Sequence, residues 1–130
     1  MEETTDRGNR FNQPAGHLEE GETILAAAIR ETLEETAYDF IPEALVGIYH
    51  WQHPGNGVTY LRFAFCGQLG AHHAERSLDD GIVRTVWKTE AEIAAQAALM
   101  RSPQVLLCVQ DYLAGKRYSL DILQHLGQAL

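Results

Sequence analysis

The sequence is poor in cysteine, in positive charge and in long apolar runs. It holds only two cysteines, Cys66 and Cys108, and no Cys-x-x-Cys pair, so neither a disulfide framework nor a zinc-cysteine site is expected. Ten Lys and Arg stand against 18 Asp and Glu, and without a basic run we expect no nucleic-acid polymer as partner. No segment approaches the roughly 18 apolar residues of a membrane span, so we expect a cytoplasmic protein without a membrane partner.

Composition also limits the size and class of the protein. With 130 residues, of which 45% are hydrophobic, the chain predicts one domain, residues 1–130, around a single core. The formal net charge is −8, which disfavours polyanions in general. Divalent cations invert this local electrostatics, so a small phosphate substrate is not excluded.

The first part of the chain predicts one strong helix after an irregular segment. Residues 1–21 are rich in glycine and are expected to be irregular, with at most a short strand at 10–13. From residue 23 to residue 36, apolar residues recur every four positions, the spacing of one helix face. These residues are Leu25, Ile29 and Leu33.

The remainder predicts alternating strands and helices. Two β-branched and aromatic runs, 44–51 and 58–68, flank the turn-forming residues 53–57 and indicate a hairpin. A strand is expected at 83–88, and helices are expected to start at Thr89 and at Ser102-Pro103, the second ending near Gly115. A last short helix is expected within 120–126. This order predicts an α+β sandwich.

Three glutamates gather on the first predicted helix. Glu31, Glu34 and Glu35 stand at i, i+3 and i+4, so their side chains share one face, away from the apolar stripe. Like charges at such spacing cost roughly 0.2–0.5 kcal/mol per exposed pair unless cations neutralise them. Carboxylate oxygens suit Mg²⁺ or Mn²⁺. The alternative is an ordinary solvated acidic face with Arg30 and Glu34 as an ion pair.

A wider spacing surrounds these glutamates. Gly16, Glu22, Arg30-Glu31 and Glu34-Glu35 stand at fixed intervals in GHLEEGETILAAAIRETLEETAY, residues 16–38. This segment resembles the Nudix box, the loop-helix-loop signature of the Nudix hydrolases. It departs from the box at Thr32, where an aliphatic residue is usual, and at Ala37, where the family has glycine. Alanine at a helix end with positive φ costs on the order of 1 kcal/mol.

The resemblance extends to motifs outside the box. It includes Asn12–His17, His50-Trp51, Tyr60–Phe63, Arg101–Pro103 and Gly115–Tyr118, which are similar to one bacterial Nudix branch. The implied fold is an α/β/α sandwich with a mixed sheet. Because relatives usually carry a hairpin of that sheet before the box and only 15 residues precede Gly16 here, we expect the usual N-terminal strands to be lacking.

The resemblance implies a chemistry and a set of roles. It implies Mg²⁺-dependent (or Mn²⁺-dependent) hydrolysis of a diphosphate linkage in a nucleoside di- or triphosphate or a thiamin-type pyrophosphate. Metal ligands would be Glu31, Glu34, Glu35 and the backbone carbonyl of Ala15. Arg30 and Glu22 would orient the box, and the general base would be Glu31 or an acid outside the helix. The alternative is a catalytically idle, Nudix-like binding domain for a phosphorylated ligand.

For the other candidate site residues the sequence leaves two interpretations open. Asp79, favoured over Asp80, is either a further metal ligand or a turn residue. Histidines at 50 and 53 could bind zinc only if a turn brought them together. Trp51 and Tyr60 would stack on a base or face the core, and Asn12 and Gln13 would bind substrate or satisfy loop backbone. Arg62, within the hairpin motif, is a further candidate for substrate binding. The expected assembly is a monomer or a homodimer.

Overall fold

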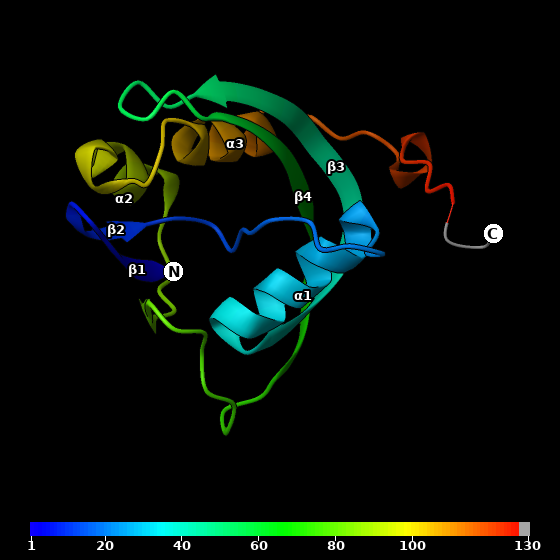
Figure 1. Ribbon diagram of the computed structural model, residues 1–130, viewed down its shortest axis with the longest axis horizontal. Coiled ribbons are helices and arrows are strands. Elements are labelled where there is room, and N and C mark those ends of the chain that lie inside the picture. The colour runs from blue at the N-terminus through cyan, green and yellow to red at the C-terminus, as the bar shows by residue number, and fades with distance from the viewer. Residues whose placement is uncertain (128–130) are drawn as a thin grey trace.

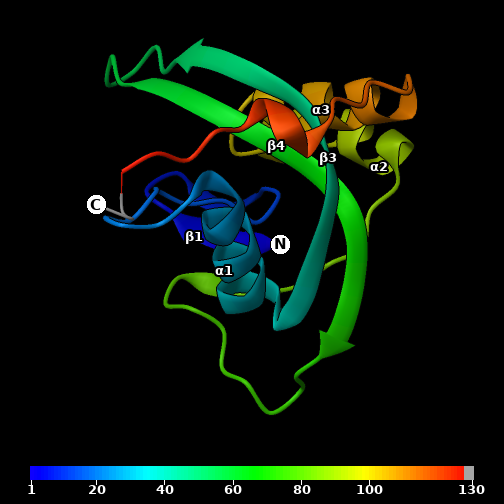
Figure 2. The same ribbon diagram turned by 90° about the vertical axis from the view of Figure 1, so that its right-hand side faces the viewer.

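The computed structural model describes residues 1–127 and has an α+β architecture with two antiparallel sheets. One sheet has the strand order β2-β1-β5, and the other pairs β3 with β4. Helix α1 lies inside the concave face of the curved β3-β4 ribbon, and α3 lies at the opposite side of the molecule (Figures 1 and 2). The element bounds are β1 Glu2–Thr5, β2 Gly8–Phe11, α1 Ile24–Thr36, β3 Tyr38–Gln52, β4 Thr59–His72, β5 Ile82–Arg84, α2 Glu90–Ala95, η1 Ala97–Leu99, α3 Gln104–Leu113 and η2 Leu120–Ile122.

The first eleven residues form a hairpin, so the prediction of an irregular segment was wrong there. Strands β1 and β2 pair in antiparallel register, from Glu2 opposite Phe11 to Thr5 opposite Gly8. Gly8 takes φ 91°, which the tight turn requires and which other residues rarely adopt. Strands therefore do precede α1, and they pair with β5 from the second half of the chain.

Helix α1 begins and ends near the predicted positions. The Thr23 hydroxyl caps its start by accepting a hydrogen bond of 3.0 Å from the Ala26 N–H. Ala37 ends it with φ 63°, and its N–H donates to the Leu33 carbonyl at 2.9 Å. Ala37 thus adopts the left-handed conformation that a glycine normally takes at a helix end. The predicted apolar stripe of this helix is not its buried face throughout. Ile29 of the stripe is 38% exposed, whereas Glu35 is buried.

The predicted hairpin is present, and its strands are longer than expected. Strands β3 and β4 pair from Tyr38 opposite His72 to Gln52 opposite Thr59, with register shifts that bend them. Pro42 lies opposite Gly67 beside one such shift. A Cβ at Gly67 would overlap with the Ile41 carbonyl oxygen, so glycine is required where the strands approach most closely.

The later elements follow the predictions with shifted ends. Strand β5 stops at Arg84 instead of residue 88, and α2 has the expected capping box between Thr89 and Glu92. Helix α3 starts at Gln104, whose N–H donates to the Ser102 hydroxyl at 3.3 Å. The expected last helix is the single 3₁₀ turn η2. Among the described residues, no helix has the length and apolar character to cross a membrane.

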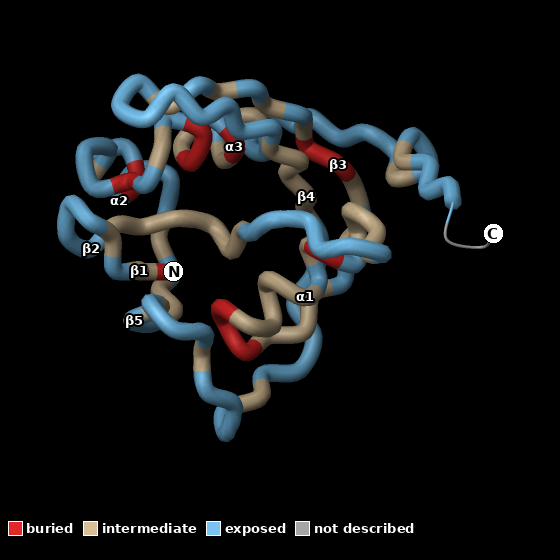
Figure 3. The backbone as a smooth tube through the Cα atoms, viewed as in Figure 1, coloured by how far each residue is buried: buried red, intermediate tan, exposed pale blue. Residues whose placement is uncertain are grey.

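The buried residues are few and lie in separate places rather than in one core (Figure 3). Ile93, Met100 and Val105 form one cluster between α2, η1 and α3. The accessible surface is 8185 Å², whereas a compact monomer of 14.5 kDa exposes about 6,900 Å². The two sheets and the two longer helices instead surround a cavity of about 1400 Å³.

Candidate functional site

Arg30 lies at the centre of a cluster of carboxylates on and before α1. Its guanidinium donates to both oxygens of Glu22, at 2.6 and 2.9 Å, in a bidentate pair. It also donates to Glu31 at 2.7 Å and to Glu34 at 3.1 Å. A fifth bond, of 3.1 Å, goes to the backbone carbonyl of His17. The hydrogen bonds from Arg30 lower the pKa of Glu22. Arg30 therefore fixes the loop before the helix and two glutamates on it.

A second feature is a triad of carboxylates beside this network. Ligand oxygens of Glu31, Glu34 and Asp79 lie within 4.8 Å of one another. The Asp79 N–H donates to the Glu34 carbonyl at 3.0 Å, which ties the loop before β5 to the helix. Burial, and next the nearby Asp79 carboxylate, raise the pKa of Glu34. The structure thus brings Asp79 to two of the three predicted glutamates.

Glu35 lies beside Glu31 but is not one of the three grouped carboxylates. It is 7% exposed, and its carboxylate accepts a 2.9 Å hydrogen bond from the Ala15 N–H. Burial raises the pKa of the Glu35 carboxyl to about 8, opposed in part by that hydrogen bond and reinforced by the neighbouring Glu31. The Ala15 peptide is therefore next to the helix carboxylates, and its N–H is the group that contacts them.

Gly16 explains why the loop can approach the helix so closely. A Cβ at this position would overlap with the Glu31 carboxylate, whose side chain is 12% exposed. Any side chain at residue 16 would displace Glu31 from Arg30 and from the triad. The glycine of the box is thus required by close approach, because the loop backbone and the glutamate occupy adjoining space.

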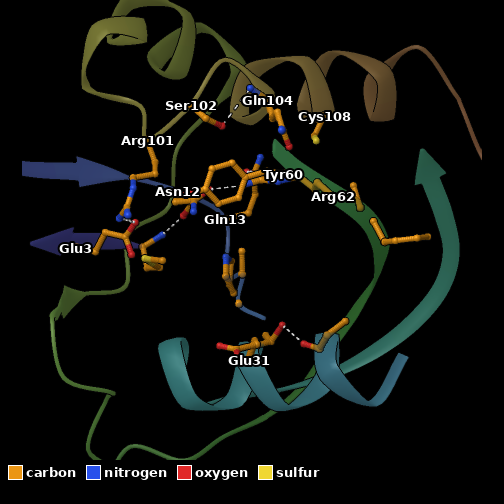
Figure 4. A pocket seen from close by; sticks show the side chains of 18 of the residues that line it. Glu3, Asn12, Gln13, Glu31, Tyr60, Arg62, Arg101, Ser102, Gln104 and Cys108 are labelled. Atoms are coloured by element: carbon orange, nitrogen blue, oxygen red, sulfur yellow. Dashed lines mark hydrogen bonds and ion pairs between the residues drawn. The ribbon is translucent and has the colours of Figure 1, made fainter. Parts of the chain in front are cut away.

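The cavity extends from Glu31 of α1 to α3. In Figure 4, Glu31 of α1 and Gln104 of α3 lie on opposite sides, and β4 forms the wall between them. Much of the wall is apolar, including Phe63 and Phe65 of β4 and Ala28 of α1. The volume exceeds the several hundred Å³ of a typical small-molecule site, so a small ligand would fill only part of it.

Arg62 forms a polar centre at the far end of this cavity. Its guanidinium donates to the side-chain oxygen of Gln13 at 2.8 Å and to that of Asn12 at 3.0 Å (Figure 4). Gln13 in turn donates to the Val105 carbonyl of α3 at 2.8 Å. For Asn12 and Gln13 the sequence left open substrate contact or bonding to loop backbone, and it did not reveal that they hold Arg62, 50 and 49 positions away respectively.

The aromatic candidates lie together on the hairpin. Trp51 is paired with Tyr60 across the strands, and their rings are stacked with centroids 5.9 Å apart. Both side chains line the cavity. His53 caps its own turn, since its Nδ1 accepts from the Gly55 N–H at 2.9 Å. Within residues 1–127 the one group of three potential metal ligands consists of carboxylates alone.

Fold and site together describe an α+β protein in which one helix presents acidic groups beside a large cavity. Residues 2–107 match the NUDIX domain family. The chain is 36% identical over 123 residues to proteins called Phosphatase NudJ from Escherichia coli strain K12 and from Shigella flexneri. These alignments cover 95% of this chain and 79% of each relative. A solved NUDIX hydrolase from Nitrosomonas europaea matches with a TM-score of 0.92 and 54% identity, covering 96% of this chain and 86% of that one.

The chain therefore belongs to the Nudix family and is a Nudix hydrolase. This confirms the resemblance drawn from the box and the Nudix fold that it implied. Members of this class act on small molecules that carry a diphosphate linkage, and the Arg30 network and the carboxylate triad lie within the matched residues.

Proposed function

We propose that residues 1–130 form one catalytic domain that hydrolyses the diphosphate linkage of a nucleoside di- or triphosphate or of a thiamin-type pyrophosphate, with Mg²⁺ or Mn²⁺ as cofactor. The observation that carries this proposal is the carboxylate triad of Glu31, Glu34 and Asp79, whose oxygens lie within 4.8 Å. Its position beside a large cavity allows a bound diphosphate to reach it. A cytoplasmic location stays a prediction from the composition.

The donor set fits a hard divalent cation. It consists of carboxylate oxygens, which Mg²⁺ and Mn²⁺ prefer over nitrogen and sulfur ligands. Glu31, Glu34 and Asp79 would hold the metal, with Glu35 and the Ala15 carbonyl as further ligands. When bound, a divalent cation supplies charge neutralisation for the diphosphate and acidifies water. Burial, and next the nearby Asp79 carboxylate, raise the pKa of Glu34, and a bound cation would oppose both effects.

The protein's own residues supply orientation and proton transfer. Arg30 holds Glu22, Glu31 and Glu34 in one arrangement, so the carboxylates keep their positions when a substrate enters. Either Glu31 or Asp79 takes the proton from the attacking water. A Glu31→Gln and an Asp79→Asn variant distinguish them, because loss of the base removes the lower limb of the pH profile of kcat.

The experiment that tests the function is release of monophosphate from a panel of nucleoside di- and triphosphates and thiamin pyrophosphate, with and without Mg²⁺. We expect metal-dependent turnover that the Glu35→Gln variant loses by at least about a hundredfold. Glu20→Gln serves as the control, because Glu20 is exposed and lies outside both carboxylate groups. No turnover from a folded, Mg²⁺-saturated sample would favour the catalytically idle binding domain instead.

A further inference from the structure

The cavity contains a buried polar group that the carboxylate chemistry does not use. Gln104, the first residue of α3, is 5% exposed and lines the cavity. Its side-chain oxygen Oε1 has no hydrogen-bond partner among the described residues. Leaving a buried polar atom unpaired is unfavourable, so a buried amide oxygen without a partner calls for an explanation.

Arg62 lies near Gln104 (Figure 4). Its guanidinium offers only N–H donors, whereas the Gln104 Oε1 is an acceptor. Gln13 bonds Arg62 through its oxygen and Val105, the neighbour of Gln104, through its nitrogen. The Gln13 side chain thus links Arg62 to the backbone of α3 at the residue after Gln104. Of the five guanidinium N–H groups, two have amide partners. Within residues 1–127 Arg62 forms no ion pair, so its charge is not compensated by a carboxylate.

A flat surface lies beside these two polar groups. Tyr60 and Arg62 are two residues apart on β4, so their side chains point to the same face of the strand. Both line the cavity with Gln104 (Figure 4). Tyr60 is also stacked with Trp51, which restricts its ring. A ring placed on Tyr60 would meet N–H donors from Arg62 and an acceptor from Gln104.

The spacing from the carboxylate triad matches this interpretation. Gln13 contacts Arg62, and Gly16 contacts Glu31, so three residues of backbone separate the two ends of the site. The backbones of Gln13 and Gly16 therefore lie at most about 10 Å apart, and the Gln13 side chain adds its own length toward Arg62. A diphosphate attached to a ring through a ribose or another short linker can bridge that distance.

We propose that Arg62, Gln104 and Tyr60 form a subsite for a heteroaromatic ring that presents an amino donor beside a ring-nitrogen acceptor. Gln104 accepts from the amino group, Arg62 donates to the ring nitrogen, and Tyr60 stacks on the ring. This edge occurs in cytosine, adenine and aminopyrimidines. Uracil and hypoxanthine present an oxo group beside an N–H instead. The proposal rests on the proposed function for the reacting end of the substrate.

The test compares matched nucleotides that differ at this edge: CTP with UTP, and ATP with ITP. We expect kcat/KM to favour the amino member of each pair by about tenfold, the effect of one hydrogen bond of roughly 1.4 kcal/mol. In Gln104→Leu the preference should disappear through a loss on CTP and ATP alone. Equal changes for both members of a pair, no preference in the parent protein, or a preference for UTP and ITP would overturn the proposal.

The choice of variants separates recognition from folding. Gln104→Leu removes an unpaired buried oxygen and should fold with an unchanged or higher Tm. Gln110→Leu, an exposed residue of the same helix, is the matched control and should keep the preference. Arg62 is less suitable, because it also anchors Asn12 and Gln13.

A binding measurement keeps the inference independent of hydrolysis. Calorimetric titration with CMP and UMP reads the ring subsite directly, because both share one monophosphate and differ only in the base. Tighter binding of CMP, lost in Gln104→Leu, would support the subsite even if no nucleotide were hydrolysed. Hydrolysis without any difference between CMP and UMP would instead leave the proposed function standing and reject the subsite.

Discussion

Arg30 shows how one cation organises an acidic site. It contacts Glu22, Glu31 and Glu34, and its Nη1 lies 3.5 Å from Glu19. The bond to Glu22 is the largest of the effects that raise the pKa of Arg30 above its already high ordinary value. Arginine can serve several carboxylates because its planar fork offers five N–H groups in fixed directions.

Replacing Arg30 by lysine should therefore impair activity although the charge is kept. A single ammonium cannot hold Glu22 bidentately and also reach Glu31 and Glu34. We expect kcat/KM to fall by about 10- to 100-fold, with a higher Mg²⁺ concentration needed for half-maximal rate. Steady-state kinetics across a Mg²⁺ titration measure both quantities. Arg76→Lys is the control, and an unchanged Mg²⁺ requirement in Arg30→Lys would contradict the assigned role.

The raised pKa of Glu35 predicts that the folded chain becomes less stable as the pH rises. This pKa is raised from 4.5 to about 8 in the folded chain, so the folded state binds more protons than the unfolded state between these values. Stability from this group is complete below pH 4.5 and is lost as the pH rises through about 8. We expect Tm in EDTA to fall over this interval.

Two comparisons isolate Glu35 as the cause of that fall. Glu35→Gln carries no titrating group and should give a flatter profile of Tm against pH. Mg²⁺ should raise Tm more at alkaline than at acidic pH, because it binds the ionised carboxylates. A Tm in EDTA that rises from pH 5 to pH 8 in the parent chain would refute the raised pKa.

At the scale of elements, local signals were sufficient for α1 and insufficient for β1. The Thr23 cap, the four-residue spacing and the helix end at Ala37 are all encoded within the helix segment. Strand β1 has the sequence Glu-Glu-Thr-Thr, without apolar alternation. It is held by distant partners, through ion pairs from Glu2 to Arg84 and from Glu3 to Arg101. Sequence patterns do not report such contacts across the chain.

The same distinction separates the parts of the site. The spacing placed Glu31, Glu34 and Glu35 on one face, and α1 does present Glu31 and Glu34 together. Glu35 differs because a loop from outside the helix, at Ala15, offers its N–H to the carboxylate. Asp79 joins the triad because its N–H is hydrogen-bonded to the Glu34 carbonyl. These two residues are 45 positions apart, and only the fold brings them together.

Replacing Ala37, at the end of α1, by glycine should have opposing effects on the free energy of unfolding that nearly cancel. Ala37→Gly would relieve a left-handed conformation that costs alanine about 1–2 kcal/mol. It would also remove a buried methyl group, worth about 0.8 kcal/mol, and add unfolded-state entropy worth about 0.4–1 kcal/mol. We expect the free energy of unfolding to change by less than about 0.8 kcal/mol in either direction in urea titrations.

Ala37→Val provides the contrast for this prediction. Valine keeps the left-handed strain and adds a branched side chain in a position that is 3% exposed. The free energy of unfolding should therefore fall by more than about 1 kcal/mol. A gain above about 1 kcal/mol for Ala37→Gly would show that backbone strain outweighs the packing of the methyl group.

At the scale of the whole molecule, the chain exposes more surface than a compact protein of its mass. The excess over the expected area is roughly 1,300 Å². Several large apolar side chains that line the cavity contribute to it, among them Leu61 at 60% and Trp87 at 72% exposure. The composition predicted a single core but not this open arrangement, because the number of apolar residues does not determine how they pack.

This surface predicts self-association. A stable interface buries about 800 Å² on each partner, which is less than the excess exposed here. Strand β4 has β3 as its only strand partner within residues 1–127, and an unpaired edge is a ready site for another strand. We expect sedimentation equilibrium to show a monomer–homodimer equilibrium that shifts with protein concentration.

A charge on the exposed strand should shift that equilibrium toward the monomer. Leu69 of β4 is 42% exposed and lines the cavity, so Leu69→Lys places an ammonium group on the expected interface. Ile122→Lys, at a 55% exposed site in η2, adds the same charge elsewhere and should leave the association unchanged. If the parent chain stays monomeric at every concentration, the prediction of self-association is wrong and the isolated chain is stable with its open cavity. Equal weakening by both variants would show that β4 is not the site of the association.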